Sequence, residues 1–356
     1  MITEFTIENF RLFDHLHLPN LSRVNLIVGK NSVGKSAVLE ALQLYYSKVS
    51  LGTVNQILRN RQEYTRQRGP EFNYYSHSIR YLYPKQMMPN LPEKGMIFKS
   101  NNLEIKAQIS AFAGSIQSNP QPVSMRELEF IEPVEPVEIR LVVTKNSTRH
   151  SARLLWPKTT VGGVSVNKPK KKEYMLLPTN GLSDKESAQL WDEIELTEME
   201  ERVINGLQLI NCDVAGVAFI EGDYKRREPV VKLSSNAHRI PLKSLGDGMT
   251  RIFQIILSLV CSKDGVLLID EFETGLHWSV QQQAWEMIFT LAEKLNVQVF
   301  VTTHSKDCVE SFEHVWSENP EQGSFYRIYR GKDSIKVQDY DSELLSDSVD
   351  TDTEVR

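Results

Sequence analysis

The sequence predicts an α/β protein built around a parallel sheet. One observation is the short apolar run 24–28, which leads through a glycine-rich loop into a stretch with apolar residues at helical spacing. A second is a pair of similar runs late in the chain, 266–269 and 297–303, which alternate with amphipathic helical stretches. Short runs that are apolar at nearly every position are typical of strands buried on both faces, and their alternation with helices favours a parallel sheet.

The N-terminal residues open this α/β pattern. Phe5 and Ile7 alternate with polar residues, which predicts a half-buried strand. The buried strand at 24–28 follows, and Val38 and Leu42 are among the apolar residues that then recur at helical spacing. We therefore expect the order strand, turn, strand, loop and helix.

The middle of the chain, 51–204, differs from both flanks. It holds an aromatic and basic stretch followed by proline-rich loops, an alternating pattern at 137–143 that predicts a strand, and a stretch at 191–210 that predicts a helix with a charged face. Because this segment interrupts the α/β pattern, we predict that it forms an inserted α+β lobe.

After residue 205 the α/β pattern returns. Apolar stretches at 250–261 and 279–296 predict helices on either side of the strand at 266–269, and alternating residues predict a closing hairpin over 325–340. The last residues are acidic and poor in aromatics, which favours disorder. The expected divisions are a split core domain of 1–50 and 205–340, an inserted lobe of 51–204 and a disordered tail of 341–356.

Composition narrows the classes of function. Lys and Arg total 41 against 46 Asp and Glu, a net charge of −5, which excludes a protein held to nucleic acid by bulk charge but not a local basic patch. No apolar run approaches the ~20 residues that span a bilayer, and the N-terminus lacks the basic start and apolar stretch of a signal peptide. The 3 cysteines lie far apart, so neither a disulfide scaffold nor a zinc knuckle is expected. We therefore expect a cytoplasmic protein without a membrane partner.

The glycine-rich loop fits the pattern GxxxxGK[ST]. Glycines let backbone N–H groups turn toward phosphate oxygens, and the following helix adds its positive N-terminus. In this pattern Lys35 faces the β- and γ-phosphates of ATP, and the Ser36 hydroxyl coordinates Mg²⁺. An ordinary glycine-rich turn is the alternative, but this loop follows a buried strand and opens a helix, as nucleotide binding requires. The predicted nucleotide-binding residues are Gly29, Lys30, Asn31, Ser32, Val33, Gly34, Lys35 and Ser36.

Two adjacent carboxylates, Asp270 and Glu271, follow the strand at 266–269. Ligands of parallel sheets bind at the carboxyl ends of the strands. Asp270 suits a water-mediated hold on Mg²⁺, and Glu271 suits the base that orients or activates an attacking water. With the phosphate loop, this pair predicts a site for ATP and Mg²⁺ that hydrolyses ATP.

Together with three further motifs, these features resemble the ABC-type, AAA-like ATPase heads of the SMC, RecF and OLD (overcoming lysogenisation defect) lineage. The likeness is greatest to compact bacterial ATPases that are often encoded in phage-defence operons. IENFRLF resembles the opening strand and turn of the lineage, and SLGDGM resembles its signature loop. DEFETGLH resembles its carboxylate pair and D-loop, and VTTHS its switch-histidine strand. The resemblance covers about 1–50 and 205–330, and it implies a P-loop ATPase of ABC-head type that is split here by the inserted α+β lobe.

The resemblance also implies roles in assembly. In such ATPases the signature loop completes the nucleotide site of the opposite subunit, so Ser244, Gly246 and Gly248 would touch the γ-phosphate of a partner's ATP. His304 would sense the γ-phosphate, and His277 would belong to the D-loop. The expected assembly is a homodimer, or a larger oligomer, closed through ATP-bound heads.

Two features of the lineage stay open in the sequence. The Q-loop glutamine has no assigned position among Gln56, Gln62, Gln86 and Gln108. Arg11 is either a residue placed against the adenine or its phosphates, or an ordinary surface arginine.

The resemblance leaves two main classes of function. The first is an ATP-driven switch that holds or releases a separate effector, a nuclease, in phage defence; the second is a RecF-like or SMC-like clamp in DNA repair or recombination. A nucleotide-binding scaffold with little turnover is a third. DNA contact, if present, is expected from the basic and aromatic stretch after residue 58. Its candidate residues include Arg59, Arg61, Arg66 and Arg68. The sequence has no long heptad segment for a coiled-coil arm, which favours the switch.

Overall fold

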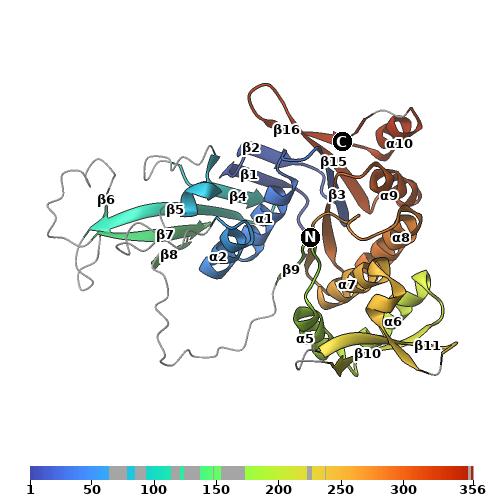
Figure 1. Ribbon diagram of the computed structural model, residues 1–356. Coiled ribbons are helices and arrows are strands. Elements are labelled where there is room, and N and C mark those ends of the chain that lie inside the picture. The colour runs from blue at the N-terminus through green and yellow to red at the C-terminus, as the bar shows by residue number, and fades with distance from the viewer. Residues whose placement is uncertain are drawn as a thin grey trace.

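The computed structural model describes residues 1–63, 78–84, 94–113, 121–123, 137–146, 148–153, 173–222, 227–236, 238–351 and 354–355. Its central element is a six-stranded sheet in which five neighbouring strands run parallel and one edge strand runs antiparallel (Figure 1). This sheet confirms the predicted α/β class. In spatial order its strands are β16 (Ile335–Tyr340), β15 (Gly323–Arg330), β3 (Val24–Val28), β14 (Gln298–Thr303), β13 (Val266–Ile269) and β9 (Tyr174–Leu177).

A second, antiparallel sheet lies beside the first. It combines strands that precede the predicted domain boundary at residue 50 with strands that follow it. In it β1 pairs with β4, so that Ile7 lies opposite Phe98. The N-terminal strands and the strands after residue 94 thus share one sheet, while the inserted lobe as a separate unit stays a prediction. The strands of this sheet are β1 (Phe5–Phe10), β2 (Phe13–Leu18), β4 (Met96–Ser100), β5 (Glu104–Ala113), β6 (Gln121–Val123), β7 (Val137–Lys145) and β8 (Thr148–Arg153).

The helices and a small three-stranded sheet complete the described fold. Two helices, α5 and α6, pack against this small sheet through β11 and β10. Its strands are β10 (Val214–Glu221), β11 (Arg227–Leu233) and β12 (Arg239–Pro241). The helices are α1 (Lys35–Tyr46), α2 (Leu51–Asn60), α5 (Asp184–Ile194), α6 (Glu198–Ile210), α7 (Asp247–Cys261), α8 (Trp278–Lys294), α9 (Lys306–Glu318) and α10 (Ser342–Asp350).

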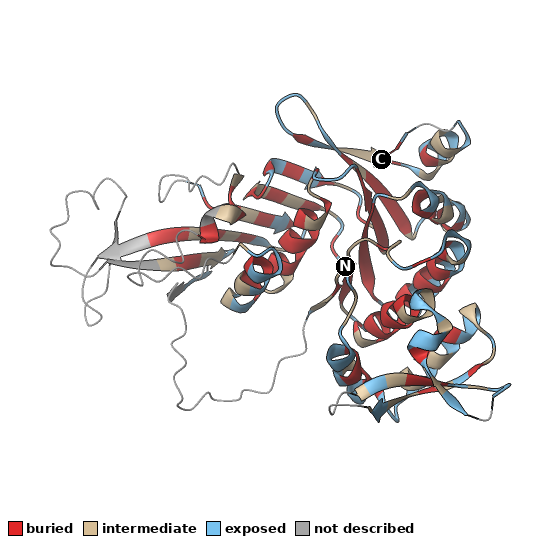
Figure 2. Ribbon diagram, viewed as in Figure 1, coloured by how far each residue is buried: buried red, intermediate tan, exposed pale blue. Residues whose placement is uncertain are grey.

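Alternation along the central strands sends side chains into two cores. In β3, Leu26 belongs to the core covered by α5 to α9, whereas Ile27 belongs to the core shared with α1 and the antiparallel sheet. In β14, Val301 and Phe300 divide in the same way. Figure 2 shows these strands as buried throughout. Burial on both faces explains why the predicted strands are apolar at nearly every position.

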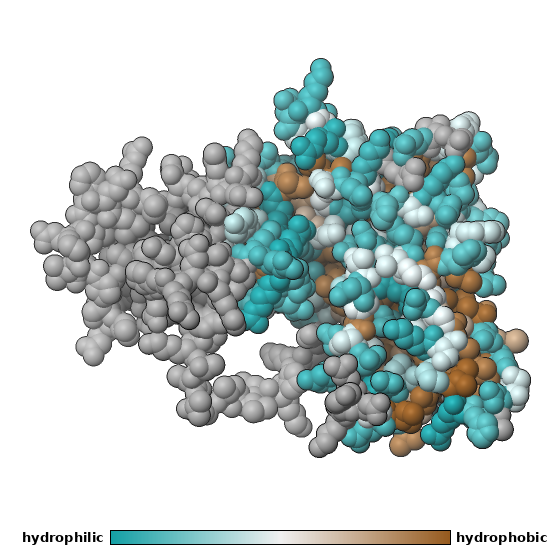
Figure 3. Space-filling view, in the orientation of Figure 1, coloured by the Kyte–Doolittle hydropathy of each residue, from teal (hydrophilic) through white to brown (hydrophobic). Residues whose placement is uncertain are grey.

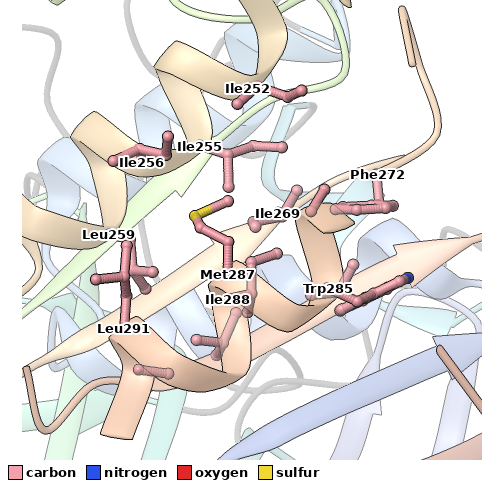
Figure 4. Close-up of a cluster of buried hydrophobic side chains, with 14 of the residues drawn as sticks. Ile252, Ile255, Ile256, Leu259, Ile269, Phe272, Trp285, Met287, Ile288 and Leu291 are labelled. Atoms are coloured by element: carbon pink, nitrogen blue, oxygen red, sulfur yellow. The ribbon is translucent and has the colours of Figure 1, made fainter. Parts of the chain in front are cut away.

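One of these cores lies directly beneath the end of β13. Figure 4 shows apolar side chains of α7 and α8 facing one another next to Ile269. The ring of Phe272, in the turn after β13, stacks on Trp285 of α8 with centroids 4.3 Å apart, and both rings are fully buried. This packing fixes the turn that carries the predicted catalytic carboxylate.

Two expectations about helices need correction. The stretch 191–210 forms parts of two helices rather than one, because the chain turns between α5 and α6 at Leu196, whose φ of 61° is left-handed. The tail expected to be disordered contains α10, which packs on α9 and buries Leu345 completely. The Asp341 side chain accepts a hydrogen bond from the Leu344 N–H and so caps this helix. A few apolar residues at helical spacing thus outweigh the acidic composition.

The visible surface of the described residues is mainly hydrophilic (Figure 3). Hydrophobic surface gathers at the lower right, where α6, β10 and β11 lie in Figure 1. The large exposed hydrophobic residues of these elements are Leu209 and Ile220. Within the described ranges, none of the helices combines the length and the apolar character needed to cross a bilayer.

Candidate active site

The carboxyl ends of the parallel strands meet at one edge of the six-stranded sheet. There β3 leads into the phosphate loop, β13 leads into Asp270 and Glu271, β14 leads into His304, and β9 leads into the turn at 178–181. Because parallel strands deliver their following residues to the same edge, motifs far apart in the chain become neighbours.

The phosphate loop wraps around the start of α1. Gly34 is the N-cap of α1 with φ 106°, and an added Cβ would lie 2.7 Å from Phe13 Cζ, so the position requires glycine. The Lys35 ammonium donates to the carbonyl oxygens of Gly29 (2.7 Å) and Lys30 (3.1 Å). No side chain caps α1, and its first turn has no acidic residue. The helix N-terminus therefore keeps N–H groups available for an anion.

Lys35 lies within electrostatic reach of the acidic end of β13. Burial lowers the pKa of the Lys35 ammonium, while the carboxylates of Glu271, Glu273 and Asp270 act in the opposite direction. The cation of the phosphate loop and the carboxylates after β13 thus belong to one electrostatic environment.

The Asp270 carboxylate connects the segments that follow several strands through hydrogen bonds. Its Oδ1 accepts hydrogen bonds from Ser36 Oγ (3.1 Å) and Thr302 Oγ1 (2.7 Å), and its Oδ2 accepts from Thr179 Oγ1 (3.3 Å). These bonds connect α1, β14 and the turn after β9 to the end of β13. The two predicted metal ligands, Ser36 and Asp270, are therefore in direct contact.

Glu271 has an unusual backbone conformation for a residue with a side chain. Its φ is 49°, in the left-handed region. Its N–H donates to Thr302 Oγ1 at 3.0 Å, and its carbonyl accepts from Arg251 Nη2 at 3.2 Å. The backbone is thus held on both sides, and the carboxylate lies 3.8 Å from His304 Nδ1.

Glu273 holds His304 more closely than Glu271 does. Its Oε1 lies 3.0 Å from His304 Nδ1 and accepts the backbone N–H of His304 at 2.9 Å. One carboxylate thus contacts both the backbone and the ring of His304.

Besides Lys35, a second cation contacts the strand ends: Arg251 on α7. Its guanidinium donates to the carbonyl oxygens of Pro178 (2.9 Å), Asp270 (3.0 Å) and Glu271 (3.2 Å). Burial lowers the pKa of Arg251 to about 10, against the favourable effect of the nearby carboxylates. Arg251 therefore remains a cation near neutral pH.

The predicted signature loop is exposed at the start of α7. Ser244 lies in a 3-10 turn, Leu242–Leu245, and Gly246 follows with φ 98° and an open space where a Cβ would project. Gly248 borders the D-loop, since an added Cβ would lie 3.3 Å from the Gly275 carbonyl oxygen. The structure therefore places the signature loop and the D-loop side by side.

His277 is the N-cap of α8. Its Nδ1 lies 2.8 Å from Ser279 Oγ and accepts the Ser279 N–H at 3.4 Å. This capping contact gives His277 a structural function in the described fold, and its D-loop role stays a prediction.

The site fits a nucleotide with Mg²⁺. A free helix N-terminus and a buried ammonium suit phosphate oxygens, and a hydroxyl beside a carboxylate suits a hard cation. In the described part of the chain, no cluster of three or more His, Cys, Asp or Glu residues could hold a metal by itself.

Arg11 is buried, which corrects the alternative of an ordinary surface arginine, while its placement against the nucleotide stays a prediction. It is 7% exposed, and its guanidinium donates to Glu40 (2.9 Å) and Glu63 (2.7 Å). Arg61, a candidate for DNA contact, donates to the other oxygen of Glu40 at 2.5 Å. The candidate Arg59 is exposed on α2, whereas Arg66 and Arg68 lie outside the described residues.

Four residues of the site carried no prediction from the sequence: Thr179, Thr302, Glu273 and Arg251. Thr302 stands next to the last residue of the VTTHS strand, and Glu273 lies inside DEFETGLH, so the motifs contained both without marking their contacts. Arg251 follows the signature loop in a largely apolar helix, and a lone arginine at such a position was the available signal.

A parallel sheet with a phosphate loop on β3, paired carboxylates after β13 and a histidine after β14 defines an ABC/AAA-like ATPase of the SMC and RecF lineage. A profile of the AAA_21 family, described as "AAA domain, putative AbiEii toxin, Type IV TA system", matches residues 24–307, and the chain belongs to this family.

Relatives and solved structures agree with this class. An "ATP/GTP phosphatase" of Helicobacter pylori is 20% identical over 344 residues, which cover 89% of each chain. The "DNA replication and repair protein RecF" of Bacillus mycoides is 29% identical over 117 residues, covering 32% of this chain and 29% of that protein. A crystal structure of the Smc head bound to the C-winged helix domain of ScpA has a TM-score of 0.52 at 11% identity and covers 96% of this chain and 97% of that one. The structural likeness shows a shared fold.

Proposed function

We propose that the protein binds ATP together with Mg²⁺ and hydrolyses it to ADP and phosphate. The observation that carries this proposal is the contact between Ser36 Oγ and Asp270 Oδ1 at 3.1 Å, with the Lys35 ammonium within electrostatic reach of Asp270 and Glu271. A phosphate-binding helix end, a cation ligand pair and a carboxylate base are the parts that this reaction needs.

Each residue has a defined part in the proposed reaction. The N–H groups of the phosphate loop and the Lys35 ammonium bind and orient the β- and γ-phosphates. Ser36 and Asp270 would hold Mg²⁺, which neutralises phosphate charge when it is bound. Glu271 orients a water whose oxygen forms a bond to the γ-phosphorus while the bond to the bridging oxygen of ADP breaks, and the water proton leaves toward the carboxylate. His304 would hydrogen-bond the γ-phosphate and sense its loss.

Two substitutions test binding and turnover separately. Lys35→Ala should abolish ATP binding, because it removes the cation that faces the β- and γ-phosphates. Glu271→Gln should bind ATP normally but lower kcat by about 10²- to 10⁴-fold, because the carboxylate base is lost while the phosphate loop remains. Equilibrium nucleotide binding and phosphate release measure the two effects. Normal turnover by Glu271→Gln would exclude Glu271 as the base.

The proposed biological role is a nucleotide-dependent switch. ATP joins two heads, with Ser244, Gly246 and Gly248 of each completing the site of the other, and the closed and open states hold or release a separate effector. The description of the matched family names a toxin of a toxin–antitoxin system, which supports a role in phage defence with an effector such as a nuclease. Co-purification from the native host, with and without Glu271→Gln, tests whether an effector binds the ATP-bound state selectively.

A DNA repair or recombination clamp is the second candidate. The similarity over 117 residues to a RecF protein favours it. The engagement of Arg61 with Glu40 disfavours a DNA surface at that point of the chain. Salt-dependent binding to duplex DNA in the presence of ATP distinguishes the clamp from the switch, because phosphate contacts weaken steeply with salt.

A further inference from the structure

We infer that Arg251 is a positioning residue for Glu271, and that it links the signature loop to the base of the reaction. The inference rests on the proposed ATPase function and adds the route by which contact at the signature loop reaches the base. It is carried by the contacts of one buried guanidinium.

The guanidinium of Arg251 binds backbone atoms rather than side chains. Nη2 donates to the carbonyl oxygens of both Asp270 and Glu271, at 3.0 and 3.2 Å, and Nη1 donates to the Pro178 carbonyl at 2.9 Å. Arg251 is 5% exposed, so water does not replace these bonds. A planar fork can bind several carbonyl oxygens in fixed directions, which the point charge of lysine cannot do.

The bond to the Glu271 carbonyl matters because the Glu271 backbone is strained. A left-handed conformation is unfavourable for an L-residue and persists only where neighbours hold it. Glu271 has φ 49°, and its N–H is held by Thr302, while its carbonyl oxygen accepts from Arg251 Nη2 and from the Thr274 N–H at 3.1 Å. Without the guanidinium only the N–H within the same turn remains on this carbonyl, so the backbone can relax and carry the carboxylate away from the position of the attacking water.

Arg251 is also joined rigidly to the signature loop. It lies in the second turn of α7, whose first residue, Asp247, directly follows Gly246. Its Cβ lies 3.8 Å from the position that a Cβ on Gly275 would occupy, so the D-loop adjoins the same part of the helix. A displacement of the start of α7, when a second copy contacts the signature loop, therefore moves the guanidinium that holds Glu271.

The test compares two substitutions on the same face of α7. Arg251→Lys keeps the charge but removes the fork, and we expect kcat to fall by about 10²-fold, because a misplacement near 1 Å has an effect of this size. ATP affinity should stay unchanged, because the phosphate loop is intact. Gln254→Met is the matched control. The Gln254 side chain bonds only one partner in the described contacts, the backbone of Leu182, at 2.9 and 3.1 Å.

Kinetics and stability are measured for both proteins. If Arg251 only stabilised the fold, both substitutions would lower Tm. The value of kcat would then change in both proteins or in neither. The expected result is a loss of kcat confined to Arg251→Lys. Should Arg251→Lys fail to melt cooperatively, Arg251→Gln takes its place, since its neutral amide can still donate to one carbonyl.

A double-mutant cycle identifies the target of Arg251. If Arg251 acts through Glu271, Arg251→Lys should have little further effect on the residual rate of Glu271→Gln protein. Full additivity, or a wild-type kcat in Arg251→Lys, would overturn the inference while leaving the ATPase proposal intact. Absence of hydrolysis by the wild-type protein would instead overturn the proposed function and this inference together.

Discussion

Among the individual residues of the site, Glu273 and His304 form a contacting pair. The groups that contact a histidine ring set its orientation. Glu273 Oε1 accepts the backbone N–H of His304 at 2.9 Å and lies 3.0 Å from the ring Nδ1. One carboxylate thereby holds both the backbone and the ring of His304.

We predict that Glu273→Ala lowers kcat by about 10- to 100-fold, the usual effect of removing a carboxylate that orients a histidine. ATP affinity should change less, because Lys35 and the loop N–H groups remain. Glu273→Gln should recover part of the rate, since its amide oxygen still accepts hydrogen bonds. Glu286→Ala, at an exposed position of α8, is the control for loss of a glutamate. Steady-state kinetics test this, and a wild-type kcat in folded Glu273→Ala would contradict it.

The Arg11 cluster is a second feature at residue scale, with an effect on stability rather than on catalysis. Arg11 binds Glu40 of α1 and Glu63 beyond α2, so one guanidinium joins the turn after β1 to both segments. Burial raises the pKa of Glu40, and the guanidinium groups of Arg11 and Arg61 oppose that rise. The two guanidinium groups therefore favour the ionised form of the Glu40 carboxylate against the effect of burial.

We predict that Arg11→Met lowers the free energy of unfolding by about 3 kcal/mol, the lower end of the range for a broken buried pair, because Glu40 then keeps only the partly exposed Arg61 as its cation. Arg227→Met is the matched control, since Arg227 binds Asp192 at 2.7 Å with both side chains well exposed, and it should cost at most about 1 kcal/mol. Urea unfolding compares them. Equal losses in the two proteins would refute the claim that burial makes the Arg11 cluster different.

At the scale of elements, the sequence identified the central strands and the motifs at their ends. The runs that became β3, β13 and β14 are apolar on both faces, so their burial pattern was visible in the residues themselves. The order of strands in the sheet was not visible, because pairing between β1 and β4 or between β9 and β13 depends on packing between distant segments. The contacts of Thr179, Thr302 and Arg251 follow from that order.

The break between α5 and α6 shows how local conformation escaped the pattern of apolar residues. Leu196 interrupts the helical stretch although the break holds no glycine or proline, and Leu196 is 94% exposed. The capping of α6 by Thr197, whose side chain accepts the Met199 N–H at 3.1 Å, stabilises the new start. A competent N-cap thus ended one helix and began another.

We predict opposite effects of the same substitution at two exposed leucines. Leu196→Gly should raise the free energy of unfolding by about 0.5 kcal/mol, because relief of the left-handed conformation, roughly 1–2 kcal/mol, exceeds the entropy gained by the unfolded chain. Leu209→Gly, in α6, should lower it by about 1 kcal/mol, the helix propensity of glycine. Thermal or urea unfolding checks both signs, and a loss at Leu196 equal to that at Leu209 would show that the φ at Leu196 carries no strain.

At the scale of the whole molecule, the phosphate loop and the signature loop belong to the starts of two different helices, α1 and α7. The residues Ser244, Gly246 and Asp247 are exposed, and Gly246 presents open backbone rather than a side chain. Glycine and serine at an exposed helix start offer N–H and hydroxyl donors to an anion. We propose that this anion is an ATP bound at the phosphate loop of a second copy.

We predict that ATP with Mg²⁺ brings two heads together and that Glu271→Gln traps this dimer, because closure needs bound ATP and opening follows hydrolysis. The several negative charges of ATP call for donors from both copies, so each site is incomplete in a monomer. Ser244→Arg should leave ATP binding by the monomer intact while a bulky cation at the exposed turn blocks closure and hydrolysis. Lys35→Ala is the control that fails at the earlier step, since it cannot bind the nucleotide.

Mass measurement at micromolar concentration with saturating ATP distinguishes the steps. Glu271→Gln should be dimeric, whereas Glu271→Gln with Ser244→Arg should be monomeric and nucleotide-bound. Lys35→Ala should be monomeric and nucleotide-free. If Glu271→Gln binds ATP and still remains strictly monomeric, the two copies do not share a site, and the signature loop has some other ligand.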